Sequence, residues 1–235
     1  MTASTTAAGV LSNIFTAPQA AFAAIKERPR PWLPLLLIIV SICAVQFTYM
    51  QVVDLPWLID SQLAASDVPT AQREQAVEAA LQLSPTLYGV FAAVPSAIII
   101  LVVYALIALY YTGVSFASND GVKFGQWFGL IAWTSLPAVF GQIASLVNLA
   151  VVDARFLPAQ QLNPLSFSSL FAIDPTGATF VESILLSLDV TTLWSTVLQI
   201  LGYQAFTQSS IVKAAIVVLG PLALIVLIGS LSALG

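Results

Sequence analysis

The feature that most constrains this chain is a series of long apolar stretches whose interiors carry no Asp, Glu, Lys or Arg. A helix that crosses a bilayer needs about 20 mostly apolar residues, because the hydrocarbon core is roughly 30 Å thick. Only 8% of the 235 residues are charged, against about 25% in soluble domains. The stretches are continuous, which favours helices over barrel strands of alternating polarity. The sequence predicts an all-α integral membrane bundle of five spans, at about 32–49, 88–114, 127–151, 190–206 and 211–234.

The fourth stretch is the weakest of the five. Six polar side chains lower its hydropathy: Thr191, Thr192, Ser195, Thr196, Gln199 and Gln204. If it did not cross the membrane, Lys213 would change sides and the chain would end on the side where it began. We expect five spans, with four as the alternative.

Basic residues set the expected orientation, because short flanking segments rich in Lys and Arg stay on the cytoplasmic side. Lys26, Arg28 and Arg30 stand directly in front of the first apolar stretch and act as the expected topology anchor. With the N-terminus inside, the inner segments also hold Lys123 and Lys213, and the outer ones hold only Arg73 and Arg155. The sequence therefore predicts the N-terminus in the cytoplasm and the C-terminus outside.

Two regions are expected: a cytoplasmic arm over 1–31 and a membrane domain over 32–235. Apolar residues recur in the arm at helical spacing, at Val10, Leu11, Ile14, Phe15, Phe22 and Ile25. This stripe predicts an amphipathic helix that either lies at the inner membrane interface or packs against the bundle. Pro18 is expected near a helix start, with Thr16 as the cap. We interpret the first apolar stretch as a retained anchor, since no small-x-small cleavage site follows it cleanly.

Two long outer loops connect the spans, at about 52–87 and 153–189. The first contains a run of good helix formers over 70–83, which predicts a surface helix. The second is expected to end in an interfacial helix over about 180–188. The short inner connections turn at Asn119-Asp120-Gly121 and near Gln208-Ser209.

The residues needed for several kinds of chemistry are missing from the sequence. The chain has no histidine and one cysteine, Cys43, so it can form neither a site rich in His and Cys nor a His-based catalytic triad. No GxxxxGK[ST] loop is present, and no acidic pair lies within a span. The formal net charge is −4 without a basic patch, which argues against nucleic acid. We therefore predict no catalytic residues, no metal, no cofactor and no enzymatic activity.

Three glycines four residues apart, Gly121, Gly125 and Gly129, stand where the third span begins. Small residues at this spacing let two helix backbones approach closely in lipid. They are the candidate face for helix packing, either within the chain or against a partner protein. Prolines within spans are expected to bend them, at Pro95, Pro137 and Pro221. Polar residues that could line a pore or bond between helices are Gln142, Asn148, Gln199 and Gln204.

Three segments resemble the Yip family of multi-pass membrane proteins, in its bacterial branch. The segment FTAPQAAFAAIKERP contributes Phe15, Pro18, Phe22 and Lys26 to this resemblance. GVKFGQWFGLIAWTSLP contributes Phe124 and Pro137, and SSIVKAAIVV contributes Lys213. The resemblance covers nearly the whole chain and agrees with five spans and an inner N-terminus.

The resemblance implies a non-enzymatic membrane protein in the bacterial cytoplasmic (inner) membrane. Its expected partners are membrane lipids and another membrane protein, such as an ABC exporter or a periplasmic adaptor; a homo-oligomer stays open. The leading hypothesis is thus a membrane scaffold or accessory subunit of a transport complex. The alternative is a small-solute or lipid transporter or channel, with Gln142 and Gln199 beside a cavity.

Overall fold

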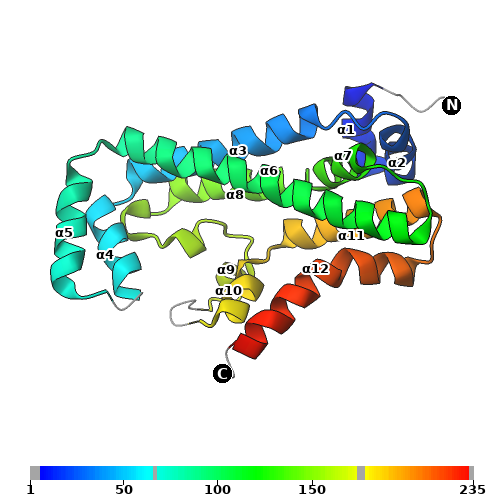
Figure 1. Ribbon diagram of the computed structural model, residues 1–235. Helices are drawn as coiled ribbons and strands as arrows, with labels where there is room; N and C mark the ends of the chain where they lie inside the picture. Colours follow the sequence, from blue (N-terminus) through cyan, green and yellow to red (C-terminus); the bar gives the residue numbers. More distant parts are fainter. Residues whose placement is uncertain (1–5, 66–67, 174–177, 233–235) are drawn as a thin grey trace. The chain divides into compact units, whose positions relative to one another are not determined.

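The computed structural model describes residues 6–65, 68–173 and 178–232, which form helices joined by turns and short loops (Figure 1). Within these ranges no residue forms a strand, and one isolated bridge pairs Ser166 with Asp189. The predicted all-α class is therefore confirmed.

The helices of the first half of the chain are α1 (Ala7–Thr16), α2 (Pro18–Glu27), α3 (Trp32–Val52), α4 (Leu55–Ala65), α5 (Thr70–Leu81) and α6 (Pro85–Ser118). Those of the second half are α7 (Phe124–Thr134), α8 (Ala138–Val151), the 3-10 turns η1 (Ala154–Phe156) and η2 (Ala159–Gln161), α9 (Phe167–Leu170), α10 (Phe180–Ser187), α11 (Val190–Thr207) and α12 (Ile211–Ser232).

Four helical segments among the described residues are long and apolar enough to cross a membrane. They are Trp32–Val52, Pro85–Ser118, Phe124–Val151 and Ile211–Ser230. They match the first, second, third and fifth predicted spans. The fourth predicted span also forms a helix, α11, of 18 residues, but it is not one of these four segments.

The third span is interrupted at its proline. Helix α7 ends at Thr134, and α8 begins at Ala138 directly after Pro137. Proline cannot donate a backbone hydrogen bond and its ring crowds the preceding turn, which explains the break. By contrast, Pro95 and Pro221 lie inside helices α6 and α12, whose helical assignment continues through them.

Contacts divide the chain into two compact units. The first contains Met1–Ile39, Ile99–Ala138 and Thr191–Gly235, and the second contains Val40–Ile98 and Val139–Val190. Helices α3 and α6 contribute residues to both units.

In the first unit, the N-terminal arm forms two helices that pack on α7. Pro18 is the first residue of α2, as its position predicts, but the residue before the helix is Ala17. The expected cap at Thr16 is wrong, because its hydroxyl instead donates to the Ser12 carbonyl within α1. Contacts of α1 and α2 with α7 show that the apolar stripe of the arm is used for packing (Figure 1).

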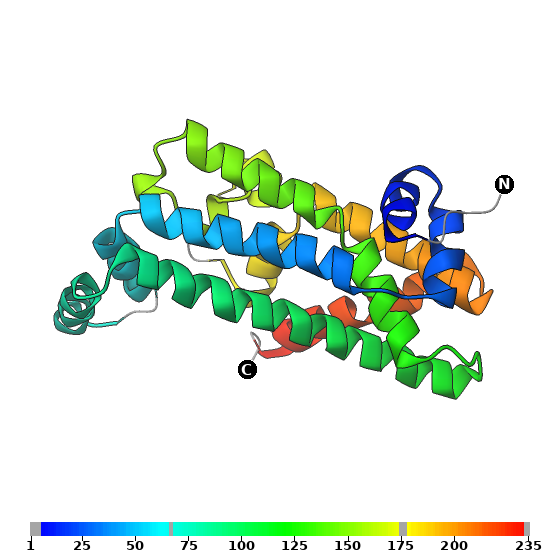
Figure 2. The same cartoon turned by 90° about the horizontal axis from the view of Figure 1, so that it is seen from above.

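In the second unit, the loop between α3 and α6, which the sequence predicts to be an outer one, forms two helices, α4 and α5, which lie side by side (Figures 1 and 2). The predicted surface helix is confirmed as α5, whereas α4 was not foreseen. Asp54 starts α4, since its carboxylate accepts the Trp57 backbone N–H at 3.0 Å and Pro56 occupies an early helical position. The predicted interfacial helix over 180–188 corresponds to α10.

Both predicted inner turns are present. Asn119 and Gly121 have φ of 54° and 72°, and Gln208 has φ of 55°. These left-handed conformations end α6 and α11 and allow the chain to reverse.

Candidate functional site

Helix α2 lies closely against α7, and this contact forms the seam of the candidate site. Phe22 and Ile25 of α2 are buried, as is α7 from Gly129 to Thr134. A Cβ atom added at Gly129 would overlap the ring of Pro29. The glycine therefore allows the segment after α2 to approach α7 closely.

Helix α11 approaches the same seam at a second glycine. A Cβ atom added at Gly202 would overlap Leu130 of α7 and come within 3.2 Å of the Phe22 ring. Phe22, which the resemblance to the Yip family singles out, thus packs where α2, α7 and α11 meet.

Side chains of α7 bond to the carbonyl end of α2. Gln126 donates from Nε2 to the Lys26 carbonyl at 2.8 Å, and Trp133 donates from Nε1 to the Pro29 carbonyl at 2.8 Å. The last carbonyls of a helix have no partner within the helix. These two bonds supply partners for α2 and the segment that follows it.

Lys26 makes a similar bond to α11. Its Nζ donates to the Phe206 carbonyl at 2.5 Å and lies 5.9 Å from the centroid of the Phe206 ring. A cation beside the carbonyl end of a helix is favourable, because that end carries partial negative charge. The lysine predicted as a topology anchor therefore also joins α2 to α11. Its neighbours Arg28 and Arg30 are exposed.

Buried aromatic rings surround Trp127 of α7. Its indole stacks on Tyr203 with centroids 5.0 Å apart, and Tyr111 meets it edge-on at 5.3 Å. Trp127 Nε1 donates to Ser115 Oγ at 2.9 Å, and the Tyr111 hydroxyl donates to Gln199 Oε1 at 3.2 Å. These contacts join α6, α7 and α11.

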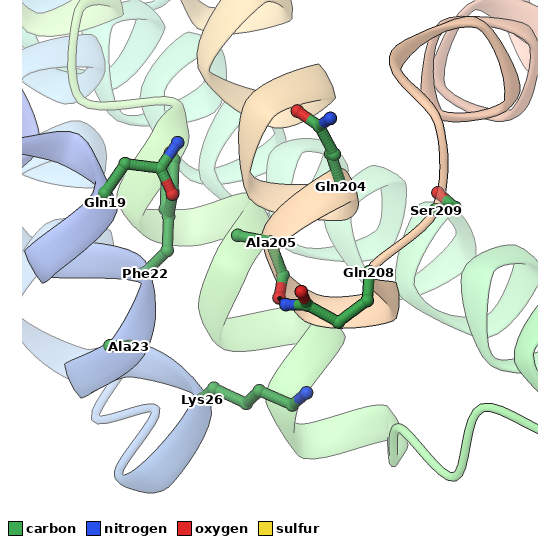
Figure 3. A pocket seen from close by; sticks show the side chains of 8 residues that line it. All are labelled: Gln19, Phe22, Ala23, Lys26, Gln204, Ala205, Gln208 and Ser209. Atoms are coloured by element: carbon green, nitrogen blue, oxygen red, sulfur yellow. Dashed lines mark hydrogen bonds between the residues drawn. The ribbon is translucent and has the colours of Figure 1, made fainter.

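A cavity of about 480 Å³ lies beside this junction (Figure 3). Lys26 extends from α2 toward the end of α11, and Gln208 lies there on the turn into α12. The cavity is lined by Gln19, Phe22, Ala23, Lys26, Gln204, Ala205, Gln208 and Ser209. Gln19 and Gln208 are exposed, so the cavity opens to the surface.

The remaining residues singled out by the family resemblance lie outside this cavity. Phe15 meets the Trp194 ring edge-on at 5.4 Å, and exposed Phe124 stacks on Phe128 at 5.9 Å. Lys213 donates to Ser118 Oγ at 3.4 Å. Phe22 and Lys26 are therefore the members of this set that line the cavity.

The three predicted glycines do not form one helix face. Gly121 precedes α7 and has positive φ, Gly125 is exposed with nothing within 4 Å of an added Cβ, and Gly129 is buried against Pro29. Gly129 thus serves packing within the chain, and Gly125 stays the candidate for contact with a partner.

Among the polar span residues, Asn148 donates to the carbonyls of Gln161 and Leu162 at 3.3 and 3.1 Å. Gln204 lines the cavity and Gln199 accepts from Tyr111. Sequence reasoning did not single out Gln19 or Trp133, because no local pattern marks them. Gln208 and Ser209 were recognised only as turn residues.

The described part of the chain shows no group of three or more His, Cys, Asp or Glu that could hold a metal ion. Cys43 is a free thiol whose Sγ lies 3.7 Å from the Ala93 carbonyl oxygen. The polar side chains at the junction instead bond to carbonyls and hydroxyls of neighbouring helices.

Four apolar helical segments of spanning length define the class of protein: an integral, multi-pass helical membrane protein. The family model described as the Yip1 domain matches residues 12–233, so the chain belongs to the Yip1 domain family. The resemblance found in the sequence is thereby confirmed at the level of the family. No significant match was found among curated proteins or among solved structures.

Proposed function

We propose that the protein is a non-enzymatic membrane scaffold or accessory subunit that binds another membrane protein. The observation that carries this proposal is that polar side chains at the junction of α2, α7 and α11 bond to backbone carbonyls. Trp133, Gln126 and Lys26 each bond to a carbonyl of another segment, which holds helices together and presents no reacting group. Membership of the Yip1 domain family supports the same role.

The proposed protein has five spans, with α11 as the fourth. Its 18 residues extend about 27 Å at 1.5 Å per residue, close to the hydrocarbon thickness. Thr191 and Ser195 are buried, and Gln199 is bonded to Tyr111. Exposed Leu193 and Val197 would then face lipid. Three of the six residues that lower the hydropathy of α11, Thr191, Ser195 and Gln199, are thus turned into the protein, whereas Thr192 is exposed.

The proposed membrane is the bacterial cytoplasmic membrane, with the N-terminus inside. An ABC exporter or a periplasmic adaptor is the candidate partner. This choice rests on the family resemblance and on the basic residues before α3. For the alternative of a transporter, the bond between Gln199 and Tyr111 favours a structural role for Gln199 over one in a transport pathway.

The test is recovery of a stoichiometric partner from native membranes with a C-terminally tagged chain under mild detergent, identified by mass spectrometry. We expect Gly125→Leu to reduce recovery, because Gly125 is exposed and an added Cβ there meets nothing. Gly113→Leu is the matched control, since Gly113 is equally open on α6. A chain recovered alone from native membranes would contradict the proposal.

A further inference from the structure

The cavity beside Lys26 has a lining suited to an anion. One cationic side chain and three glutamines line it, and none of its eight lining residues is Asp or Glu. The Gln208 amide lies nearest to the side of Lys26 (Figure 3). Lys26 Nζ has three N–H donors. One of them bonds to the Phe206 carbonyl, so two could bond to a ligand. The Gln208 amide donates one N–H to the Ala205 carbonyl at 2.7 Å and keeps another.

The charge of Lys26 matters because the carbonyl end of α11 lies beside the cavity. Without Lys26, the carbonyl end of α11 would repel an anion, since helix C-termini carry partial negative charge. The Lys26 ammonium lies in contact with the Phe206 carbonyl and offsets this charge. An anion in the cavity would therefore depend on Lys26 more than on the amides.

The cavity also lies next to the starts of two candidate spans. Helix α3 begins at Trp32, six residues after Lys26, and α12 begins at Ile211, two residues after Ser209. The side chains of Trp32, Ile211 and Val212 are exposed and apolar. Groups at the ends of spans lie at the level of the lipid headgroups. The exposed apolar side chains beside the cavity would then contact the acyl chains of a bound lipid.

We infer that this cavity binds the phosphate group of an anionic phospholipid. Lys26 holds the phosphate as the charged donor, and the Gln208 amide donates to one of its oxygens. Gln19 and Gln204 line the remainder of the cavity. A volume of about 480 Å³ falls within the usual range of small-ligand sites, about 300–1,000 Å³. The same chemistry would accept a soluble phosphate, so the experiment separates the two sources. The inference does not depend on a protein partner.

The experiment is native mass spectrometry of the full chain in mild detergent, titrated with phosphatidylglycerol or phosphatidylcholine. We expect tighter binding of phosphatidylglycerol, and Lys26→Gln to weaken it by about tenfold or more, the effect of losing one charge-assisted hydrogen bond. Arg28→Gln is the matched control, since it removes a neighbouring charge that does not line the cavity. Equal losses in both variants, or equal binding of the two lipids, would overturn the inference.

A second variant tests the cavity without disturbing the bond between Lys26 and Phe206. Gln208→Gly removes one amide, and glycine tolerates the positive φ at this position. We expect weaker binding of phosphatidylglycerol at an unchanged melting temperature; unchanged binding would count against the site. Tighter binding of inorganic phosphate than of phosphatidylglycerol, lost in Lys26→Gln, would overturn the phospholipid as ligand and assign the site a soluble phosphate.

Discussion

Gly125 and Gly129 lie four residues apart on α7, yet an added methyl group would meet different surroundings at each. At Gly129 it would overlap Pro29, and at Gly125 it would meet nothing within 4 Å. The spacing in the sequence makes the two glycines look equivalent. Their difference arises because Pro29, a hundred positions earlier in the chain, packs against only one of them.

We therefore expect Gly129→Ala and Gly125→Ala to change stability in opposite directions. Gly129→Ala should destabilise the fold by about 1–3 kcal/mol, as overpacking does. Gly125→Ala should be neutral or stabilising by up to about 1 kcal/mol, because alanine favours the helix. Thermal unfolding in detergent, followed by circular dichroism, measures both. A lower melting temperature for Gly125→Ala than for Gly129→Ala would contradict the seam between α2 and α7.

At the scale of elements, α10 shows how a short helix is fixed by its first turn. The Thr179 hydroxyl accepts the Glu182 backbone N–H at 3.3 Å, and the Glu182 carboxylate accepts the Thr179 backbone N–H at 2.8 Å. This reciprocal pair is a capping box. The bond from the Thr179 backbone N–H, followed by that from its hydroxyl, lowers the pKa of Glu182.

The lowered pKa gives a dependence on pH. Because the folded-state pKa of Glu182 lies below its unfolded value, the cap stabilises α10 above the unfolded pKa and is lost as pH falls through the folded pKa. In Thr179→Ala the pKa of Glu182 should rise part of the way, since the backbone N–H remains. Thr179→Ser should leave it low. Carboxyl ¹³C NMR of glutamate-labelled protein measures the titration, and identical curves for Ala and Ser would exclude the hydroxyl bond.

At the scale of the whole molecule, α11 decides the topology. With α11 in the membrane the chain has five spans and ends opposite to where it began. Without α11 it has the four spans set by length and apolarity alone, and its two ends lie on one side.

Reporter fusions on either side of α11 test this directly. We expect alkaline phosphatase to be active when fused after Ser187, before α11, and inactive when fused after Ser209, beyond it. The reason is that this enzyme is active only outside the cytoplasm. A fusion after Gly235 should again be active. Equal activity after Ser187 and Ser209 would show that α11 does not cross the membrane.

Much of the fold was predictable because its signals are local. Charge-free apolar runs predicted the four helical segments of spanning length. Three prolines were expected to bend their helices, and only at Pro137 does a helix end, whereas α6 and α12 continue through Pro95 and Pro221. Good helix formers predicted α5, and the Asn119–Gly121 segment predicted its turn. Helix α4 could have been found from Asp54 and Pro56, which together mark a helix start.

The sequence by itself determined that this chain belongs in a membrane, because hydropathy depends only on the residues within each stretch. Only the tertiary structure decided which residues meet. Lys26 bonds to Phe206, 180 positions away, and Trp133 bonds to Pro29, 104 positions away. Such pairs form because packing brings the carbonyl ends of α2 and α11 beside polar side chains from other segments. No local pattern encodes that encounter, so the cavity beside Lys26 became visible only in the folded chain.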